Sequence, residues 1–343
     1  YFGVQTFATG IYQAWFSMGD RVAGAQLALC LLTVALLLAT LERIQRGAAK
    51  RYPGRGQNGA PLAAAELRGL AGLAAALLCF LPVFFGFLLP VIILGTLAVD
   101  AEQSLFSERY MGFMRNSLVL ASVAAVLTML AAVLIGTTHR LRRSRATRSM
   151  TLLAGLGYAV PGGVIAVGLL VPFAAFDNAL DAFMRERFDL STGLLFTGSI
   201  WLLILAYMVR FMAAALGAYD GGQATIHTNM DAVARTLGHG PASMLRKVHL
   251  PILRPSVLTA ALIVFVDVMK ELPATLIMRP FNFDTLAVQA HRLAADERLH
   301  QAAVPSLVIA AIGLLPVILV CRSIASHGRR PAGGAVLAER PAG

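Results

Sequence analysis

The sequence predicts an all-α polytopic membrane protein with about seven transmembrane helices. Of its 343 residues, 57% are hydrophobic and only 14% are charged, whereas soluble domains carry about 25% charged residues. The mean hydropathy is +0.71. The net charge of +11 comes from separate clusters between apolar stretches, and a nucleic-acid-binding surface would gather it in one patch. We therefore predict a lipid bilayer as the partner and no nucleic acid.

Seven stretches are long and apolar enough to cross a bilayer, because a spanning helix needs about 20 mainly apolar residues. The second stretch continues almost to Val99 and contains Pro82 and Pro90, which predicts either a kink or an interfacial turn after the span. The predicted spans are 22–41, 69–89, 117–137, 150–172, 194–216, 256–276 and 303–320.

The orientation follows from the distribution of lysine and arginine, which are enriched in cytoplasmic connections. Four alternate connections hold 19 of the 29 basic residues, and the other four hold 8. The richer set is 42–68, 138–149, 216–255 and 321–343. We therefore expect these connections in the cytoplasm, the N-terminal end outside and the C-terminal end inside.

The first span is separated from the other six by residues 43–68, which are rich in glycine, proline and arginine and predict a flexible cytoplasmic linker. Residues 69–322 would form a six-helix domain, and residues 323–343 a disordered cytoplasmic tail. Residues 1–42 would be the end of a preceding half. Because the chain opens on Tyr1 without a signal peptide, we expect it to begin within a longer polypeptide.

A faint internal repeat is consistent with two halves. The segments before the first and the last span each show a phenylalanine, a threonine four residues later, and then an acidic residue followed by arginine. The matched residues are Phe2, Thr6, Asp20 and Arg21 against Phe281, Thr285, Glu297 and Arg298.

The loop 217–255 is too polar to cross a bilayer, yet its pattern is regular. Asn229 is a candidate N-cap with Asp231 in the first helical turn, where a carboxylate suits the positive end of a helix. Gly238 supplies a left-handed residue that ends this helix. Pro241 starts a second helix at its first position, and Pro251 is expected to end it. The loop therefore predicts two short helices at an angle.

Two other interpretations of this loop are open. An amphipathic helix could rest on lipid headgroups. The stretch also resembles a helix-turn-helix, but too little polar sequence flanks it to build the three-helix core of such a domain.

The spacing within this loop resembles a signature of permease subunits in binding-protein-dependent ATP-binding-cassette importers. That signature is Glu-Ala-Ala, three residues, Gly, nine residues, then Ile-x-Leu-Pro. Here residues 232–234 fill the first slot, Gly238 follows at the right distance, and residues 248–251 read Val-His-Leu-Pro. The family's acid is replaced by Ala232, and Asp231 lies one residue earlier.

Residues 265–299 look like the permease of the ferric-iron importer family, in which two six-helix halves are fused, and residues 1–21 are similar to the region before the last helix of the first half. The resemblance covers nearly the whole chain. It implies that this chain holds the end of the first half and all of the second.

The resemblance implies that ATP is hydrolysed by separate subunits, since the chain has no phosphate-binding Gly-x-x-x-x-Gly-Lys-Ser/Thr loop. The short helix around Gly238 would dock in a cleft of an ATPase dimer and transmit its motion to the spans. The residues implied in this coupling are Asp231, Ala232, Ala234, Arg235, Gly238, Leu250 and Pro251.

Three charges in the predicted sixth span are candidates for the translocation path. Asp267, Lys270 and Glu271 follow one another at i, i+3 and i+4 and would share a helix face. Carboxylates could attract a hard cation. Alternatively, Lys270 neutralises a carboxylate and the cluster only holds helices together or lies at the outer interface.

We therefore predict the permease of an importer in the bacterial inner membrane that moves ferric iron from a periplasmic binding protein into the cytoplasm, without cofactor, resident metal or catalytic site. The binding protein would dock on the outer side near His291 and His300. Other cargoes stay open: thiamine, phosphonate, sulfate or polyamine. A membrane-embedded enzyme or a structural anchor is disfavoured, since no loop gathers a catalytic set and an anchor needs no such signature.

Overall fold

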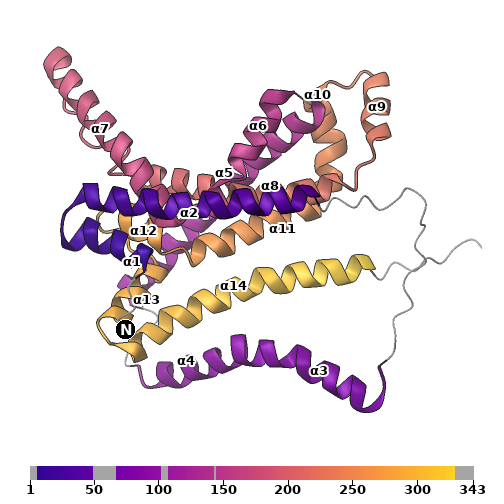
Figure 1. Cartoon of the computed structure of the whole chain (residues 1–343), viewed down its shortest axis with the longest axis horizontal. Helices are drawn as coiled ribbons and strands as arrows, with labels where there is room; N and C mark the ends of the chain where they lie inside the picture. Colours follow the sequence, from indigo (N-terminus) through magenta and orange to yellow (C-terminus); the bar gives the residue numbers. More distant parts are fainter. Residues whose placement is uncertain (1–5, 49–66, 102–106, 143, 329–343) are drawn as a thin grey trace, which may run out of the picture.

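The computed structural model describes residues 6–48, 67–101, 107–142 and 144–328, and these form helices joined by short connections with no strand among them. Figure 1 shows their arrangement. The helices in chain order are α1 (Phe7–Tyr12), α2 (Arg21–Ala48), α3 (Gly69–Val83), α4 (Leu89–Val99), α5 (Glu108–Leu141), α6 (Arg145–Ala154), α7 (Gly162–Phe188), α8 (Ile200–Gln223), α9 (Thr228–Thr236), α10 (Pro241–Met244), α11 (Leu250–Met269), α12 (Pro273–Met278), α13 (Leu286–Ala295) and α14 (Leu299–Gly328).

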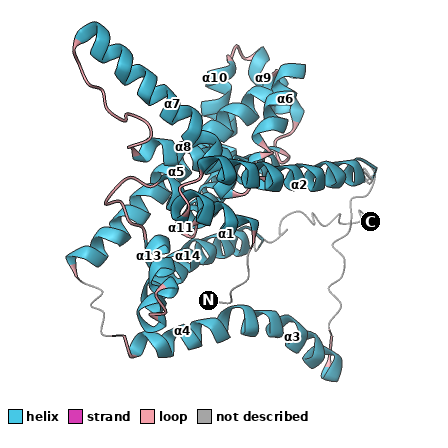
Figure 2. Ribbon diagram, turned by 60° about the vertical axis from the view of Figure 1, so that its left-hand side comes forward, coloured by secondary structure: helices cyan, strands magenta, loops and turns pink. Residues whose placement is uncertain are grey.

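Among the described residues, seven helical segments are long and apolar enough to cross a membrane, which confirms the predicted class of fold. The segment Gly69–Val99 is one continuous path in which a π-helical turn, Phe84–Leu88, follows Pro82 and separates α3 from α4. The predicted irregularity is therefore present. This segment packs through α4 along α14 and lies away from the central helices (Figures 1 and 2).

The core is formed by α5, α8 and α11, which pack against one another. Small side chains line the contact, with Ala121, Ala124 and Ala132 fully buried on α5. At Gly136 an added Cβ would lie 2.5 Å from the Tyr219 ring, and the Thr137 hydroxyl hydrogen-bonds the Tyr219 hydroxyl at 2.7 Å. Small residues let helices approach closely inside a bilayer, where burial of apolar surface gives little driving force.

The predicted span 150–172 is wrong, because a break divides it. An amphipathic helix, α6, ends at Ala154, a short 3₁₀ turn occupies Gly157–Ala159, and α7 begins at Gly162. Glycines and Pro161 interrupt an otherwise apolar stretch, and proline offers no N–H for a continuing helix. Hydropathy alone did not detect the break, since every residue around it is apolar or small.

The predicted span 256–276 is also wrong at both ends. The helical path starts at Pro241 and stops at Met269, and residues 273–278 form the separate helix α12. Pro255 lies inside α11 without ending it.

Two predicted boundaries shift outward. Helix α2 continues to Ala48 and α14 to Gly328, so helix includes the first residues of the predicted linker and of the predicted tail. Residues 49–66 and 329–343 lie outside the described part of the chain.

The two segments of the internal repeat adopt similar local structure. Thr6 caps α1 and Thr285 caps α13 through their side chains. A residue with positive φ, Gly19 in one segment and Glu297 in the other, precedes the long helix by two positions. The sequence match of Asp20 with Glu297 is therefore wrong by one residue, because a π-helical turn at Gln13–Ser17 adds a residue to the first segment. Phe2 lies outside the described residues.

Candidate functional site

The bounds predicted for the loop, 217–255, are wrong at both ends, because α8 continues to Gln223 and α11 begins at Leu250. Between them the chain forms two short helices and a left-handed turn. The N-cap of α9 is His227, whose Nδ1 accepts the Asn229 N–H at 3.3 Å, so the prediction of Asn229 as N-cap is wrong. Asp231 lies in the first turn of α9. Gly238 has φ +77°, which confirms the predicted left-handed residue after the helix.

The second helix of the loop starts at Pro241 as predicted but does not end at Pro251. Helix α10 leads into a π-helical turn, Leu245–His249, and this leads directly into α11. The Leu250 N–H donates to the Leu245 carbonyl, five residues back. This wider turn lies directly before Pro251, so the missing N–H of the proline does not end the helical path. The loop therefore joins α11 by continuous helix.

Asp231 is the centre of a cluster that we call the loop joint, formed by Arg140, Asp231 and His249. Arg140 Nε donates to Asp231 Oδ2 at 2.8 Å, and His249 Nε2 donates to Asp231 Oδ1 at 2.7 Å. The three side chains are 12%, 13% and 0% exposed, respectively. Each carboxylate oxygen thus has a donor from a different helical segment, α5 on one side and the turn before α11 on the other.

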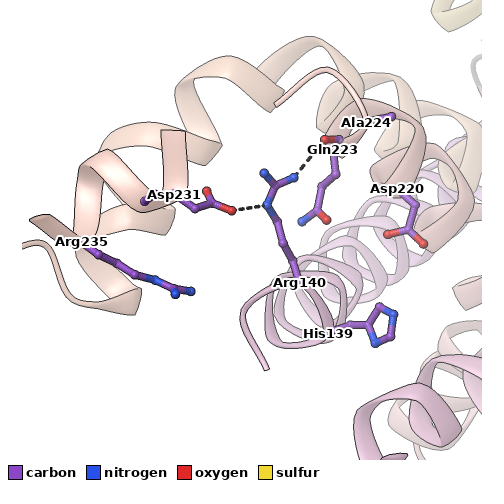
Figure 3. Close-up of a pocket in the computed structure, with 8 residues that line it drawn as sticks. His139, Arg140, Asp220, Gln223, Ala224, Asp231 and Arg235 are labelled. Carbon is purple, nitrogen blue, oxygen red and sulfur yellow. Dashed lines mark hydrogen bonds and ion pairs between the residues drawn. The ribbon is translucent and has the colours of Figure 1, made fainter. Parts of the chain in front are cut away.

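Arg140 extends the loop joint to the end of α8. Its Nη1 donates to the Gln223 carbonyl at 3.0 Å and its Nη2 to the Ile226 carbonyl at 2.9 Å. Figure 3 shows Arg140 between Asp231 and Gln223. The planar guanidinium has donors on several edges, so one side chain can satisfy carbonyls at a helix end and a carboxylate together.

The surroundings keep Asp231 ionised. Burial opposes its charge, but the hydrogen bonds from His249 and Arg140, and the charge of Arg140, outweigh burial and hold the Asp231 pKa below its ordinary value. Charge-assisted hydrogen bonds of this length are stronger than neutral ones. The loop joint therefore fixes α9 to the helices beneath it at neutral pH.

The remaining residues of the loop signature divide between the surface and the interior. Ala232, Arg235, Gly238 and Pro251 are exposed, Ala234 is buried, and Leu250 is half-buried. Arg235 lines a pocket of about 570 Å³ that Asp231 also borders. An apolar groove on the other side of α9 is lined by Met230, Val233, Leu237 and Val248, among others.

Sequence reasoning missed two members of the loop joint. Arg140 was part of a basic run that fits the enrichment of lysine and arginine in cytoplasmic connections, and His249 fell on a variable position of the family signature. The available signal was chemical: a histidine just before Leu-Pro, in a segment with an apolar face, needs a polar partner when it is buried.

The prediction that Asp267, Lys270 and Glu271 share a helix face is wrong. Lys270 pairs with Asp267 at 2.9 Å and is 63% exposed. Helix α11 ends at Met269, however, so Glu271 lies beyond its end and turns inward, where its side chain is 2% exposed and 3.9 Å from Arg210. The nearby Pro273 starts a new helix, which forces the chain out of the α11 path.

The search for a metal centre covers the part of the chain that the structure describes. Within the described ranges, no group of three or more His, Cys, Asp or Glu side chains could hold a metal ion. His291 is exposed on α13 and meets the Tyr12 ring edge to face, with ring centroids 6.4 Å apart.

Residues 126–330 match the family of binding-protein-dependent transport system inner membrane components. This region includes the loop 217–255 and the α5–α8–α11 core, apart from the first part of α5. It covers more than half of the chain.

Two relatives differ in how much of their length the chain covers. The Fe(3+)-transport system permease protein FbpB 2 of Haemophilus influenzae is 26% identical over 329 residues, which is 92% of this chain. The chain spans only 60% of the length of that relative. The putative 2-aminoethylphosphonate transport system permease protein PhnV of Salmonella choleraesuis is 26% identical over 267 residues, 74% of this chain and 94% of the relative.

Solved structures share the fold. A chain of a bacterial ABC transporter involved in the import of the acidic polysaccharide alginate superposes with a TM-score of 0.56 at 17% identity, over 76% of this chain and 96% of that one. The same type of transporter in complex with an alginate pentasaccharide-bound periplasmic protein gives a TM-score of 0.53.

Proposed function

The chain belongs to the family of binding-protein-dependent transport system inner membrane components, and from this premise we propose that it is the transmembrane permease of an ATP-driven importer. In this proposal the chain moves cargo by alternating access, while partner subunits hydrolyse ATP. The loop 217–255 and the C-terminal end lie in the cytoplasm, as the distribution of basic residues indicates. Residues 69–322 act as one permease half, and residues 1–42 are the end of the other.

The loop joint is the observation that carries this proposal. A force transmitted from outside the membrane needs a stiff path, and Asp231 ties α9 to α5 through Arg140 and to α11 through His249. Arg140 adds the end of α8. The three helices contacted are the three that form the core. A push on α9 would therefore move the core helices together.

The partner that applies the force is an ATPase dimer, and we propose that it docks on the face of α9 that points away from the core helices. Met230, Val233 and Leu237 are 46%, 56% and 71% exposed there. An exposed apolar strip on a short helix is typical of a surface that inserts into a groove of a partner. The Asp231 carboxylate points toward the core helices, and both of its oxygens are hydrogen-bonded within the chain. In this proposal Asp231 therefore does not replace the family's acid, whose position Ala232 occupies, in a contact with the ATPase.

For the cargo, we propose ferric iron delivered by a periplasmic binding protein that docks on the outer side. Support comes from the relative named as an Fe(3+)-transport permease, which matches along 92% of the chain. A phosphonate is the second candidate, because the 2-aminoethylphosphonate relative is matched over 94% of its own length.

The coupling proposal is tested by substituting Gly238 in the complex with its ATPase, reconstituted in vesicles. Gly238→Pro fixes φ near −65° where the chain has +77°, so the direction of the helix that follows should change. We expect ATP hydrolysis to persist while uptake per ATP falls at least tenfold. Gly240→Ala is the matched control, because Gly240 has φ −72° and open space around an added Cβ. Unchanged uptake by the Gly238 variant would remove the loop from the mechanism.

The cargo proposal is tested by stimulation of ATPase activity in the same complex. Binding protein loaded with ferric iron should stimulate hydrolysis, and binding protein loaded with 2-aminoethylphosphonate should not. The reverse result would reassign the cargo and leave the coupling proposal intact.

A further inference from the structure

We propose that Arg210, Glu271 and Gly162 form a positioning device inside the membrane, here named the intramembrane joint, which holds the ends of two interrupted helices on α8. Only the predicted effect of this joint on uptake rests on the proposed transport function. It assigns Glu271 a partner and a role different from that of a cargo ligand.

The intramembrane joint lies near the middle of α8. Arg210 is ten residues from the start of this helix and thirteen from its end, or roughly 15 Å and 20 Å at 1.5 Å per residue. Two interruptions between helices lie beside this part of α8, one between α6 and α7 and one between α11 and α12. At the first of them, Gly157 lies directly on the backbone of Val209, where an added Cβ would overlap the Val209 carbonyl.

Glu271 lies in the interruption between α11 and α12 and caps the start of α12. Its carboxylate accepts the N–H of Ala274 at 3.3 Å and the N–H of Thr275 at 3.2 Å, both in the first turns of α12. The Thr275 hydroxyl lies 3.1 Å from the same carboxylate and 2.5 Å from the Tyr207 hydroxyl of α8. Backbone groups at a helix start need such acceptors where water is excluded. The oxygens of Glu271 are therefore occupied by the protein itself.

Arg210 links this interruption to the other one. Its Nε lies 3.9 Å from Glu271 Oε1, and its Nη1 donates to the Val160 carbonyl at 3.4 Å, just before α7. An unpaired charge at this depth would be costly, and charged residues in spans face a partner or a cavity. Arg210 neutralises Glu271 and at the same time satisfies a carbonyl that the break leaves without a helical partner.

Gly162 leaves room for the pair and no more. A Cβ at this position would lie 2.6 Å from Arg210 Nη1 and in overlap with Glu271 Oε1. Its neighbour Gly163 is different, since an added Cβ would only make ordinary contacts, at 3.8 Å and 4.0 Å, with Ile277 and Ile11. The first residue of α7 is therefore shaped by the charge pair, and the second is not.

This geometry suits a joint between moving parts. The contacts of Arg210 are long, and a guanidinium presents five donors in a fork, so it can exchange one acceptor for another while staying beside Glu271. The ends of α7 and α12 could then shift relative to α8 without exposing an unpaired charge. Alternating access requires such shifts near the midplane, where discontinuous helices meet.

A charge-neutralisation cycle in the full complex tests the inference. Glu271→Gln and Arg210→Gln each leave one charge unpaired, and the double variant leaves none. We expect uptake to fall at least tenfold in each single variant and to return to within about threefold of wild type in the double variant, with the melting temperature following the same pattern. If Glu271 were a ligand of a cationic cargo, the double variant would stay inactive, and that result would overturn the inference.

Two glycine-to-alanine variants, which change the packing and not the charge, provide a second test if a charge variant fails to fold. Gly162→Ala should lower both melting temperature and uptake, whereas Gly163→Ala should leave both close to wild type. Equal effects of the two substitutions would contradict the joint. The melting temperatures need no ATPase and no cargo, so they report on the joint even if the proposed transport function is wrong.

Discussion

The loop joint and the intramembrane joint both pair an arginine with a carboxylate, yet they are built for different tasks. In the loop joint both carboxylate oxygens of Asp231 have donors within 2.8 Å. In the intramembrane joint Arg210 stands 3.9 Å from Glu271, whose oxygens mainly hold the start of α12. Short, fully paired contacts make a rigid connection, whereas a long contact with spare donors permits rearrangement. In the proposed transport function, force would enter through the stiffer connection and be converted to motion at the looser one.

The largest expected effect comes from removing the centre of the loop joint. Asp231→Ala leaves Arg140 and the fully buried His249 without their acceptor, and breaking a buried pair by removing one partner costs about 3–5 kcal/mol. We expect a lower melting temperature and the loss of most coupled uptake. Arg235→Ala, one turn further along the same helix and exposed, is the control and should leave the melting temperature unchanged. Equal stability of Asp231→Ala and wild type would show that the loop joint does not stabilise the fold.

A steric change beside the intramembrane joint should have the next largest effect. Gly157→Ala places a methyl group against the Val209 backbone, and backbone cannot move aside as a side chain can. Overpacking typically costs about 1–3 kcal/mol, measured by denaturation in detergent. Gly168→Ala provides the matched control in α7, because nothing lies within 4 Å of its added Cβ. A Gly157 variant as stable as the control would argue against the close approach to α8.

The stabilisation that Asp231 provides should depend on pH in a defined direction. Its pKa in the folded protein is lowered by the contacts of the loop joint, whereas the unfolded chain titrates near 3.9. The contribution is therefore complete above about pH 4 and is lost as the pH falls through the lower, folded pKa. The difference in melting temperature between wild type and Asp231→Asn should therefore shrink as the pH falls below about 4. A difference that grows on acidification would reverse the sign and refute this assignment.

The smallest effect is expected for Lys270, the exposed neighbour of Glu271. Its pair with Asp267 is a surface ion pair with Lys270 63% exposed, and such pairs contribute about 0.2–1 kcal/mol. Lys270→Gln should change the melting temperature little, in contrast to Glu271→Gln one position later. If the two substitutions lowered the melting temperature equally, Glu271 would contribute no more to stability than an exposed ion pair, which would contradict its role in the intramembrane joint.

Much of the fold follows from hydropathy, because a bilayer imposes length and composition on every spanning helix. Each of the seven predicted spans overlaps one of the long apolar segments in the described part of the chain. Most of their boundaries shift, and the predicted spans 150–172 and 256–276 each include a break in the helix. Two of the errors have backbone causes that hydropathy does not report. At residues 155–161 the helix breaks within a stretch of mostly small and apolar residues. Before Pro251, a π-helical turn lets the helix continue past a proline that was expected to end it.

The site was predictable where local rules apply. Gly238 was placed in a left-handed conformation from its position after a helix, and the structure has it there. The partners of Asp231 and Glu271 were not predictable, since Arg140 and Arg210 are 91 and 61 positions away in the sequence. Only the packing of α5, α8 and α11 brings these charges together, and neither periodicity nor spacing encodes that packing.

The most direct test of a rigid loop joint is the distance between spin labels on α9 and α5, measured in the complex with the ATPase with and without ATP. Thr138 of α5 and Thr236 at the end of α9 are exposed positions suited to labelling, and neither belongs to the apolar strip proposed to contact the ATPase. We predict a narrow distribution that stays the same in both nucleotide states and broadens in Asp231→Asn. A broad distribution in the wild-type complex, or one that shifts on ATP binding, would contradict the claim that α9 and the core move as one body.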